Sequence, residues 1–203
     1  MNKKLTNVRY LPLGDSYTIG EGVAINANFP SLLTQDLQTK GIDTAIVAQP
    51  ALTGYTTQDV LDYQISLLAS SQANFCTLLI GVNDWVQEVS TAIYRENLGR
   101  ILTVIKQKVG SQLVLLSIPD FSVSNEGAKY SKGRNISQGI QAFNEIAKEL
   151  AQKEDVIMVD IFSLSQRQKG DAYFAADQLH PSTKAYKEWV DLMLPTVIST
   201  LVD

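Results

Sequence analysis

Five short apolar segments alternate along this chain with longer segments in which apolar residues recur every three or four positions. Each short segment is nearly continuous in apolar character, which is typical of strands covered on both faces. This order of strands and helices predicts an α/β fold with a doubly wound parallel sheet and helices on both faces. In such a fold, ligands bind beyond the carboxyl ends of the strands. The expected strands are residues 8–13, 44–49, 75–80, 112–118 and 156–161.

The longer segments have helical spacing, and several carry residues favoured at helix ends. Thr56 or Thr57 can serve as an N-cap, and Pro181 is expected in the first turn of the last helix. The polar segment 119–135 is expected to form a loop over the strand ends. The expected helices are residues 28–41, 56–70, 91–110, 136–154 and 181–201.

Composition limits the number of domains and the class of partner. A chain of 203 residues with 45% hydrophobic content is sufficient for one domain over residues 1–203. The net charge of −4 and the lack of a basic stripe argue against nucleic acid, because phosphate binding needs clustered Lys and Arg. No segment has the length of a transmembrane helix, and the N-terminus lacks the apolar core of a signal peptide. We therefore expect a cytoplasmic protein, with a secreted protein lacking its leader as the alternative.

The sequence Gly14-Asp15-Ser16 follows the first expected strand directly, and two more glycines come within the next six positions. Glycine, aspartate and serine are common in turns, so an ordinary turn is one explanation. The other is that a tight turn lifts Ser16 into the crevice at the strand end as a nucleophile. That function requires a base and an oxyanion hole elsewhere in the chain.

His180 is the one histidine of the sequence, so an imidazole base can come from this position alone. Asp177 lies three residues earlier, a spacing that can place both side chains on one side of a turn. A carboxylate bonded to one ring nitrogen fixes the tautomer and leaves the other nitrogen free to accept a serine proton. The simpler alternative is that Asp177 and Pro181 begin the last helix and leave His180 exposed.

Two further turns supply candidate donors for an oxyanion. Asn83 follows the third expected strand, and its amide could donate a hydrogen bond that is typically worth about 3 kcal/mol of barrier. Gly54 follows the second, and its backbone N–H can approach a ligand without an intervening Cβ. Each residue alone is also ordinary in a turn. Their conjunction with the serine and histidine turns favours a catalytic site, because these strand ends converge in a doubly wound sheet.

In this order the motifs resemble the SGNH (GDSL) hydrolase superfamily. Gly-Asp-Ser at 14–16, the loop glycine, Gly-x-Asn-Asp at 81–84 and Asp-x-x-His-Pro at 177–181 spread the resemblance over residues 10–182. It implies a three-layer α/β/α sandwich with a five-stranded parallel sheet, flavodoxin-like, and an esterase or lipase that uses no metal or organic cofactor. The name-giving Gly-Asp-Ser-Leu differs at its fourth place, where this chain has Tyr17.

By this resemblance Ser16 is the nucleophile, His180 is the base and later the acid, and Asp177 orients His180. Gly54, Asn83 and the backbone N–H of Ser16 form the oxyanion hole. These roles predict hydrolysis of small-molecule carboxylic esters through an acyl-serine intermediate.

Asp15 and Asp84 also match family positions, and we interpret them as hydrogen-bonding braces of their turns. The charged residues of the long loop either meet an anionic head group or form a solvated surface. These residues are Lys129, Lys132 and Arg134.

Four aromatic residues near the expected strand ends are candidates for substrate binding, with packing in the core as the alternative for each. An apolar pocket would favour short- to medium-chain acyl esters or lysophospholipids, and a shallow polar pocket would favour acetylated sugars. The candidates are Tyr17, Tyr55, Trp85 and Phe121.

Two alternatives come from outside the hydrolases. One is a catalytically idle binding protein on the same fold. The other is a flavodoxin-like binder of a nucleotide or flavin, which needs a phosphate-cradling loop after the first strand. Residues 14–22 contain neither Gly-x-Gly-x-x-Gly nor a Walker lysine, so the sequence disfavours this second alternative.

Overall fold

The computed structural model describes residues 7–202 of the chain. The expectation that the chain starts without a signal peptide depends largely on residues 1–6, which lie outside the described residues. None of the helices in the described part is long and apolar enough to cross a membrane.

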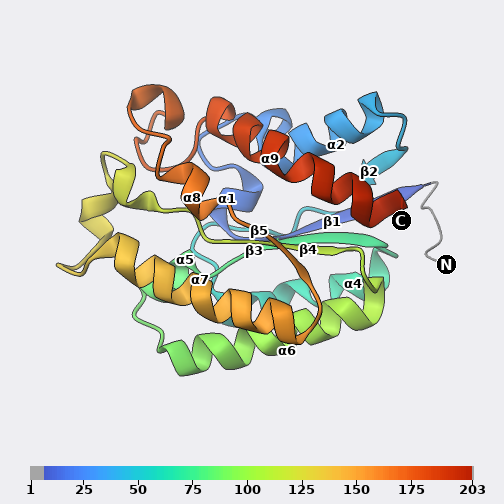
Figure 1. Ribbon diagram of the computed structural model, residues 1–203, viewed down its shortest axis with the longest axis horizontal. Coiled ribbons are helices and arrows are strands. Elements are labelled where there is room, and N and C mark those ends of the chain that lie inside the picture. The colour runs from blue at the N-terminus through green and yellow to red at the C-terminus, as the bar shows by residue number, and fades with distance from the viewer. Residues whose placement is uncertain (1–6, 203) are drawn as a thin grey trace.

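A parallel sheet of five strands forms the centre of the molecule, in the order β2-β1-β3-β4-β5 (Figure 1). This is the flavodoxin-like strand order, and it confirms the α/β fold expected from the alternation of segments. Every strand falls on one of the five apolar segments. The strands are β1 (Val8–Gly14), β2 (Thr44–Ile46), β3 (Phe75–Leu79), β4 (Leu113–Leu116) and β5 (Ile157–Val159).

Burial of the strands follows their place in the sheet. The inner strands β3 and β4 are buried at every position, and β1 at every position except Arg9. The edge strands β2 and β5 each keep an exposed residue. Gly14 at the end of β1 pairs with Leu79 at the end of β3, so the turns that follow these strands begin side by side.

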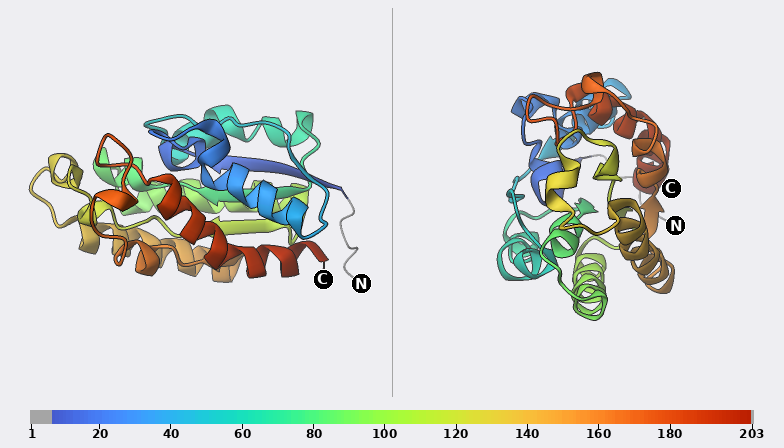
Figure 2. Two further views of the ribbon diagram at one scale, coloured as in Figure 1. Left: turned by 90° about the horizontal axis from the view of Figure 1, so that it is seen from above. Right: turned by 90° about the vertical axis from the view of Figure 1, so that its left-hand side faces the viewer.

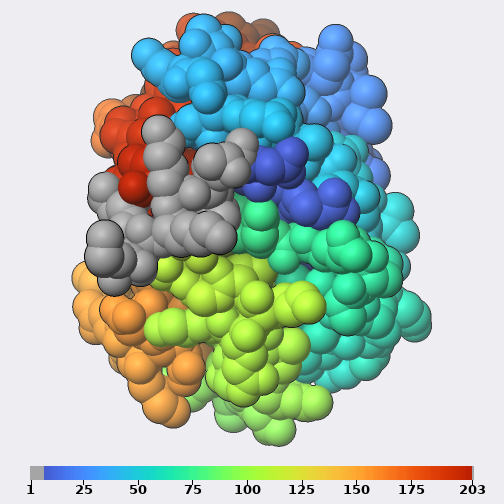
Figure 3. All heavy atoms as spheres, turned by 90° about the vertical axis from the view of Figure 1, so that its right-hand side faces the viewer, coloured from blue at the N-terminus to red at the C-terminus, as the bar shows by residue number. Residues whose placement is uncertain are grey.

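Helices cover both faces of the sheet and complete a three-layer sandwich (Figures 1 and 2). α2 and α9 pack together on one face, and α6 and α7 pack together on the other. Figure 3 shows the right-hand side of Figure 1, where β1 begins and where α6 and α9 end. The long helices are α2 (Phe29–Thr39), α6 (Thr91–Val109), α7 (Ile136–Lys153) and α9 (Thr183–Val202).

Short helices occupy most of the turns at the carboxyl ends of the strands. The α-helical ones are α1 (Ser16–Ile19), α5 (Val82–Val86) and α8 (Phe162–Ser165). The 3-10 turns are Ile25–Ala27, Phe121–Val123, Gly127–Tyr130 and Asp171–Tyr173. Two of these 3-10 turns lie within the expected loop 119–135, which carries the buried side chain of Phe121.

The segment expected as one helix over 56–70 is divided into three parts. These are α3 (Thr57–Asp59), a π-helical turn (Val60–Gln64) and α4 (Leu67–Ser70). Of the two expected N-caps, Thr56 is the one observed, and it forms a capping box with Asp59. The π-helical turn ends at the fully buried Gln64, and wide turns of this kind often occur at functional sites.

Pro181 does not lie in the first turn of the last helix, because α9 begins at Thr183. Pro181 instead pairs with Phe174 in an isolated antiparallel bridge. The amide of Ser182 donates to the Tyr173 carbonyl, and the amide of Ala175 donates to the His180 carbonyl. The segment before α9 is therefore a closed loop rather than a helical turn.

Candidate active site

Gly14 ends β1 with a backbone that only glycine adopts readily. Its φ is +151°, and an added Cβ would lie 2.2 Å from the Leu79 carbonyl oxygen and 2.3 Å from the Thr18 hydroxyl. Asp15 then serves as the N-cap of α1, and Ser16 is the first residue of that helix. The sharp turn places Ser16 at the carboxyl end of a central strand.

Gln64 holds this turn from the neighbouring helical segment. Its side-chain oxygen accepts the Gly14 N–H at 3.0 Å, and its amide nitrogen donates to the Gly14 carbonyl at 2.7 Å. Gln64 is not among the site residues expected from the sequence, although the sequence contains a signal for its role. Gln64 stands between Val60 and Leu68 on the apolar stripe of its segment, where a polar residue has to find a buried partner.

Asp15 is fully buried directly behind the serine turn. Its Oδ1 accepts the Tyr17 N–H at 3.0 Å, while its Oδ2 has no hydrogen-bond partner among the described residues. Burial raises the pKa of Asp15 to about 8, and the nearby negative charge of Asp84 adds to the effect. The side chain is therefore a neutral acid at pH 7.

Ser16, His180 and Asp177 form one hydrogen-bonded chain. The Ser16 Oγ lies 3.0 Å from His180 Nε2, and His180 Nδ1 lies 2.6 Å from Asp177 Oδ2. His180 is only 8% exposed, which contradicts the simpler alternative of a histidine left at the surface. The structure thus brings together three residues that the sequence separates by up to 164 positions.

The second carboxylate oxygen of Asp177 fixes the loop that carries the histidine. It accepts the backbone N–H groups of Leu179 and His180, each at 3.0 Å. Partial burial opposes ionisation of Asp177, but the His180 ring and these two N–H groups outweigh it and hold the pKa of the carboxyl below its usual value. An ionised Asp177 requires a proton on Nδ1, so Nε2 is left to accept the proton of Ser16.

Asn83 and Gly54 line the same cleft as the serine and the histidine. One hydrogen of the Asn83 amide goes to the Tyr55 carbonyl at 2.9 Å, and the other is available to a ligand. Gly54 has φ +83°, but an added Cβ would meet nothing within 4 Å. The positive φ therefore favours glycine at this position. The approach of a ligand to its backbone N–H stays a prediction.

Asp84 fastens the Gly54 loop to α5. Its buried carboxylate accepts the Thr57 N–H at 2.9 Å and the Thr57 hydroxyl. The Asn97 amide donates to the same hydroxyl at 3.3 Å, a contact that the sequence did not indicate. These bonds connect the start of α3 to the turn that carries Asn83.

The cleft has a volume of about 240 Å³, and two of the four aromatic candidates line it, Tyr17 and Phe121. The other two lie beside it. Tyr55 packs on Tyr63 with ring centroids 5.9 Å apart. Trp85 is buried against Phe121 at 5.8 Å and below the Arg134 guanidinium at 3.9 Å. The complete lining is Ser16, Tyr17, Glu21, Thr53, Gly54, Val82, Asn83, Val86, Phe121, Tyr130, Leu179 and His180.

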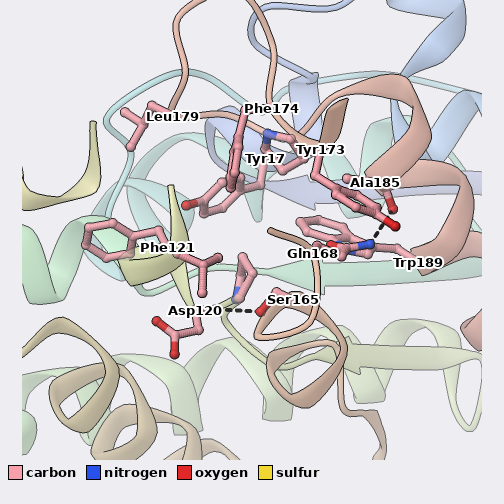
Figure 4. Close-up of a pocket in the computed structure, with 13 residues that line it drawn as sticks. Tyr17, Asp120, Phe121, Ser165, Gln168, Tyr173, Phe174, Leu179, Ala185 and Trp189 are labelled. Atoms are coloured by element: carbon pink, nitrogen blue, oxygen red, sulfur yellow. Dashed lines mark hydrogen bonds between the residues drawn. The ribbon is translucent and has the colours of Figure 1, made fainter. Parts of the chain in front are cut away.

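A second, smaller cavity adjoins the cleft, and its lining is drawn in Figure 4. Its volume is about 20 Å³, enough for one water molecule. Tyr17, Phe121 and Leu179 line both spaces and form the wall between them. Figure 4 shows Phe174 and Trp189 among the side chains around this cavity, which is mainly apolar.

One group of potential metal ligands occurs in the described part of the chain, formed by Glu21, Asp177 and His180. One ligand atom from each lies within 4.8 Å of the others. Both ring nitrogens of His180 already have partners in Asp177 and Ser16. A metal ion would therefore have to break the hydrogen-bonded chain, and the donor set does not favour such a site.

The chain is similar to a family of known proteins. The model of a family described as GDSL-like Lipase/Acylhydrolase matches residues 13–188. An arylesterase of Vibrio mimicus is 26% identical over 182 residues, which cover 90% of this chain and 84% of the relative. The thioesterase 1/protease 1/lysophospholipase L1 of Escherichia coli (strain K12) is 26% identical over 184 residues, or 90% of this chain and 80% of that protein.

Similarity also extends to a solved structure. Axe2, an acetylxylan esterase from Geobacillus stearothermophilus, superposes with a TM-score of 0.76 over 95% of each chain. Its sequence identity is 17%, so this likeness concerns the fold.

Proposed function

The chain belongs to the GDSL-like lipase/acylhydrolase family, and from that premise we propose that it hydrolyses short- to medium-chain carboxylic esters through an acyl-serine intermediate. The observation that carries the proposal is the hydrogen-bonded chain Ser16–His180–Asp177 at the wall of an open cleft, with distances of 3.0 and 2.6 Å. These distances allow proton transfer from the hydroxyl to the imidazole without rearrangement.

The acylation step uses each side chain at a stated atom. Ser16 Oγ attacks the ester carbonyl carbon while His180 Nε2 takes its proton. Asp177 stabilises the imidazolium through its hydrogen bond to Nδ1. The free hydrogen of the Asn83 amide and the backbone N–H groups of Ser16 and Gly54 bind the oxyanion, which acquires its full charge only in the tetrahedral state.

Collapse of the tetrahedral state breaks the bond to the alcohol oxygen. His180 Nε2 returns its proton to that oxygen, and the alcohol leaves with Ser16 acylated. A water molecule then attacks the acyl carbonyl and gives its proton to Nε2. A second collapse releases the carboxylic acid and restores the Ser16 hydroxyl.

The two ends of the cleft differ in polarity, and this difference supports an assignment of the substrate groups. Tyr17, Phe121 and Leu179 form an apolar wall in front of the inner cavity, so the acyl chain is assigned to this side. Glu21 and Thr53 form a polar part of the same lining, and the alcohol group is assigned to it. A cleft of about 240 Å³ suits a short or medium acyl chain.

The proposal is tested by hydrolysis of p-nitrophenyl esters from acetyl to palmitoyl, with an acetylated xylo-oligosaccharide as comparison. Ser16→Ala and His180→Ala are each expected to lose at least about 10³-fold in kcat, with circular dichroism and thermal unfolding close to those of the parent. Ser66→Ala is the matched control, because Ser66 is exposed and lies outside the cleft lining. Ser16→Ala hydrolysing these esters at the parent rate would refute the proposal.

A further inference from the structure

Glu21 is a carboxylate of the cleft that the catalytic chain does not use. Its backbone N–H donates to the Ser16 carbonyl at 3.0 Å, so its position is fixed one turn from the nucleophile. Its Oε2 lies 3.7 Å from His180 Nε2 and accepts a hydrogen bond from the Thr53 hydroxyl. The side chain is 39% exposed and therefore accessible to a ligand in the cleft.

The distance from Glu21 to His180 decides which part of an ester meets this carboxylate. The leaving alcohol oxygen has to come within one hydrogen bond of Nε2, about 3 Å, to receive its proton. Because Glu21 Oε2 lies 3.7 Å from the same nitrogen, the leaving oxygen is held within about 7 Å of the carboxylate. The alcohol group therefore lies within reach of the charge on Glu21.

No lysine or arginine in the described chain lines the cleft and offsets this charge. Three cations lie in the loop that contributes Tyr130 to the lining, and each has another partner. Lys132 pairs with Glu88 at 2.7 Å. Lys129 pairs with a glutamate of its own loop. Arg134 donates to the Trp85 carbonyl at 2.8 Å and covers its ring. This arrangement does not favour binding of an anionic head group by the loop.

One aromatic residue that is not assigned to the acyl side borders the same cleft as the carboxylate. It is Tyr130, whose side chain is 43% exposed. A carboxylate together with aromatic faces is the combination that recognises quaternary ammonium groups, through Coulomb attraction and cation–π contacts.

We propose that Glu21 is a specificity-determining residue of the alcohol side, which favours esters of cationic alcohols and disfavours esters of anionic ones. The inference rests on the proposed esterase function and adds the charge of the preferred alcohol to it. A quaternary ammonium alcohol of the size of choline is the probe that this geometry fits.

The experiment compares two esters of the same shape, the choline ester and the 3,3-dimethylbutyl ester, with the acyl group that performs best in the p-nitrophenyl series. The kcat/KM of each is measured by proton release at low ionic strength and divided by its rate of alkaline hydrolysis. The enzyme is expected to prefer the cationic ester about tenfold, as for charges about 6 Å apart in a partly screened site. In Glu21→Gln this preference is expected to fall to within twofold of unity.

Glu88→Gln is the matched control, because it changes the net charge equally but lies outside the cleft lining. It is expected to keep the tenfold preference. A 3-sulfopropyl ester completes the series, and Glu21→Gln is expected to hydrolyse this anionic substrate faster than the parent does. Equal loss of activity toward the cationic and neutral esters in Glu21→Gln would indicate a structural role and overturn the inference.

Failure of the esterase proposal can be told apart from failure of this inference. If none of the esters is hydrolysed, the proposed function is wrong. Binding of choline and of 3,3-dimethylbutanol is then measured by nuclear magnetic resonance titration of the parent and of Glu21→Gln. A preference for choline that depends on Glu21 supports the inference, and equal binding of the two alcohols overturns it.

Discussion

Replacement of Asp15 by asparagine tests the claim that this buried side chain is a neutral acid. The asparagine oxygen can keep the hydrogen bond from the Tyr17 N–H, and its NH₂ group takes the place of Oδ2, which has no partner among the described residues. A protonated carboxyl carries its O–H at the same unsatisfied position. The variant and the parent should therefore have nearly equal free energies of unfolding at low pH.

The free energies of unfolding of the two proteins should diverge as the pH rises. Asp15 has a pKa of about 8 in the folded chain against an ordinary value of 3.8, so the folded state binds this proton more tightly than the unfolded state does. The free energy of unfolding then falls as pH rises between the two pKa values. Each unit is worth about 1.36 kcal/mol, so the parent should lose about 4 kcal/mol between pH 5 and pH 8 through this group alone.

Urea unfolding of both proteins at pH 5 and pH 8 measures the effect. The difference between the two proteins removes the contributions of groups that do not interact with Asp15. The pKa of Asp84 is also raised, chiefly by burial, and its charge interacts with Asp15, so the measured difference includes this coupling. Asp15→Asn is expected to gain several kcal/mol over the parent on going from pH 5 to pH 8. Parallel stability curves would show that Asp15 is ionised in the folded protein and would refute the reasoning.

Two further variants address the site itself. Asp177→Asn is expected to lower kcat/KM by about 10³- to 10⁴-fold, because its oxygen must face the two backbone N–H groups and its NH₂ then forces the wrong tautomer on His180; activity within tenfold of the parent in steady-state assays would contradict this. Leu179→Ala is expected to move the optimum of the p-nitrophenyl series to longer acyl chains, since Leu179 separates the cleft from the inner cavity. An unchanged optimum would show that the acyl chain lies elsewhere.

The strands of the sheet were predictable because each is a local apolar segment that can be recognised without tertiary information. The π-helical turn was not, and Gln64 at its end bonds to Gly14, which lies 50 positions away. The start of α9 was also misplaced by two residues, at Pro181. A proline favours a first helical turn on local grounds, but here its pairing with Phe174 closes the loop of the histidine instead.

The residues of the candidate site were accessible from the sequence for a different reason. Their residue types and their order along the chain form an unusual combination. The distances between them depend on the conformations of the turns, which the sequence motifs do not determine. The aromatic candidates show the limit of this reasoning. All four follow strand ends, yet Trp85 packs against Arg134 and Phe121, and Tyr55 packs against Tyr63. Only the orientation of each ring, which depends on its neighbours, decides whether it reaches the cleft.

Buried polar contacts explain how short turns can hold a catalytic geometry. Gln64 fixes both backbone groups of Gly14, and Asp84 fixes the start of α3. Breaking one partner of such a buried pair leaves an unsatisfied group at a cost of about 1–3 kcal/mol. Opening one of these turns therefore costs free energy that opening a solvent-exposed loop does not. Glu21 is partly exposed and outside this network, so we expect a change of its charge to leave the catalytic arrangement in place.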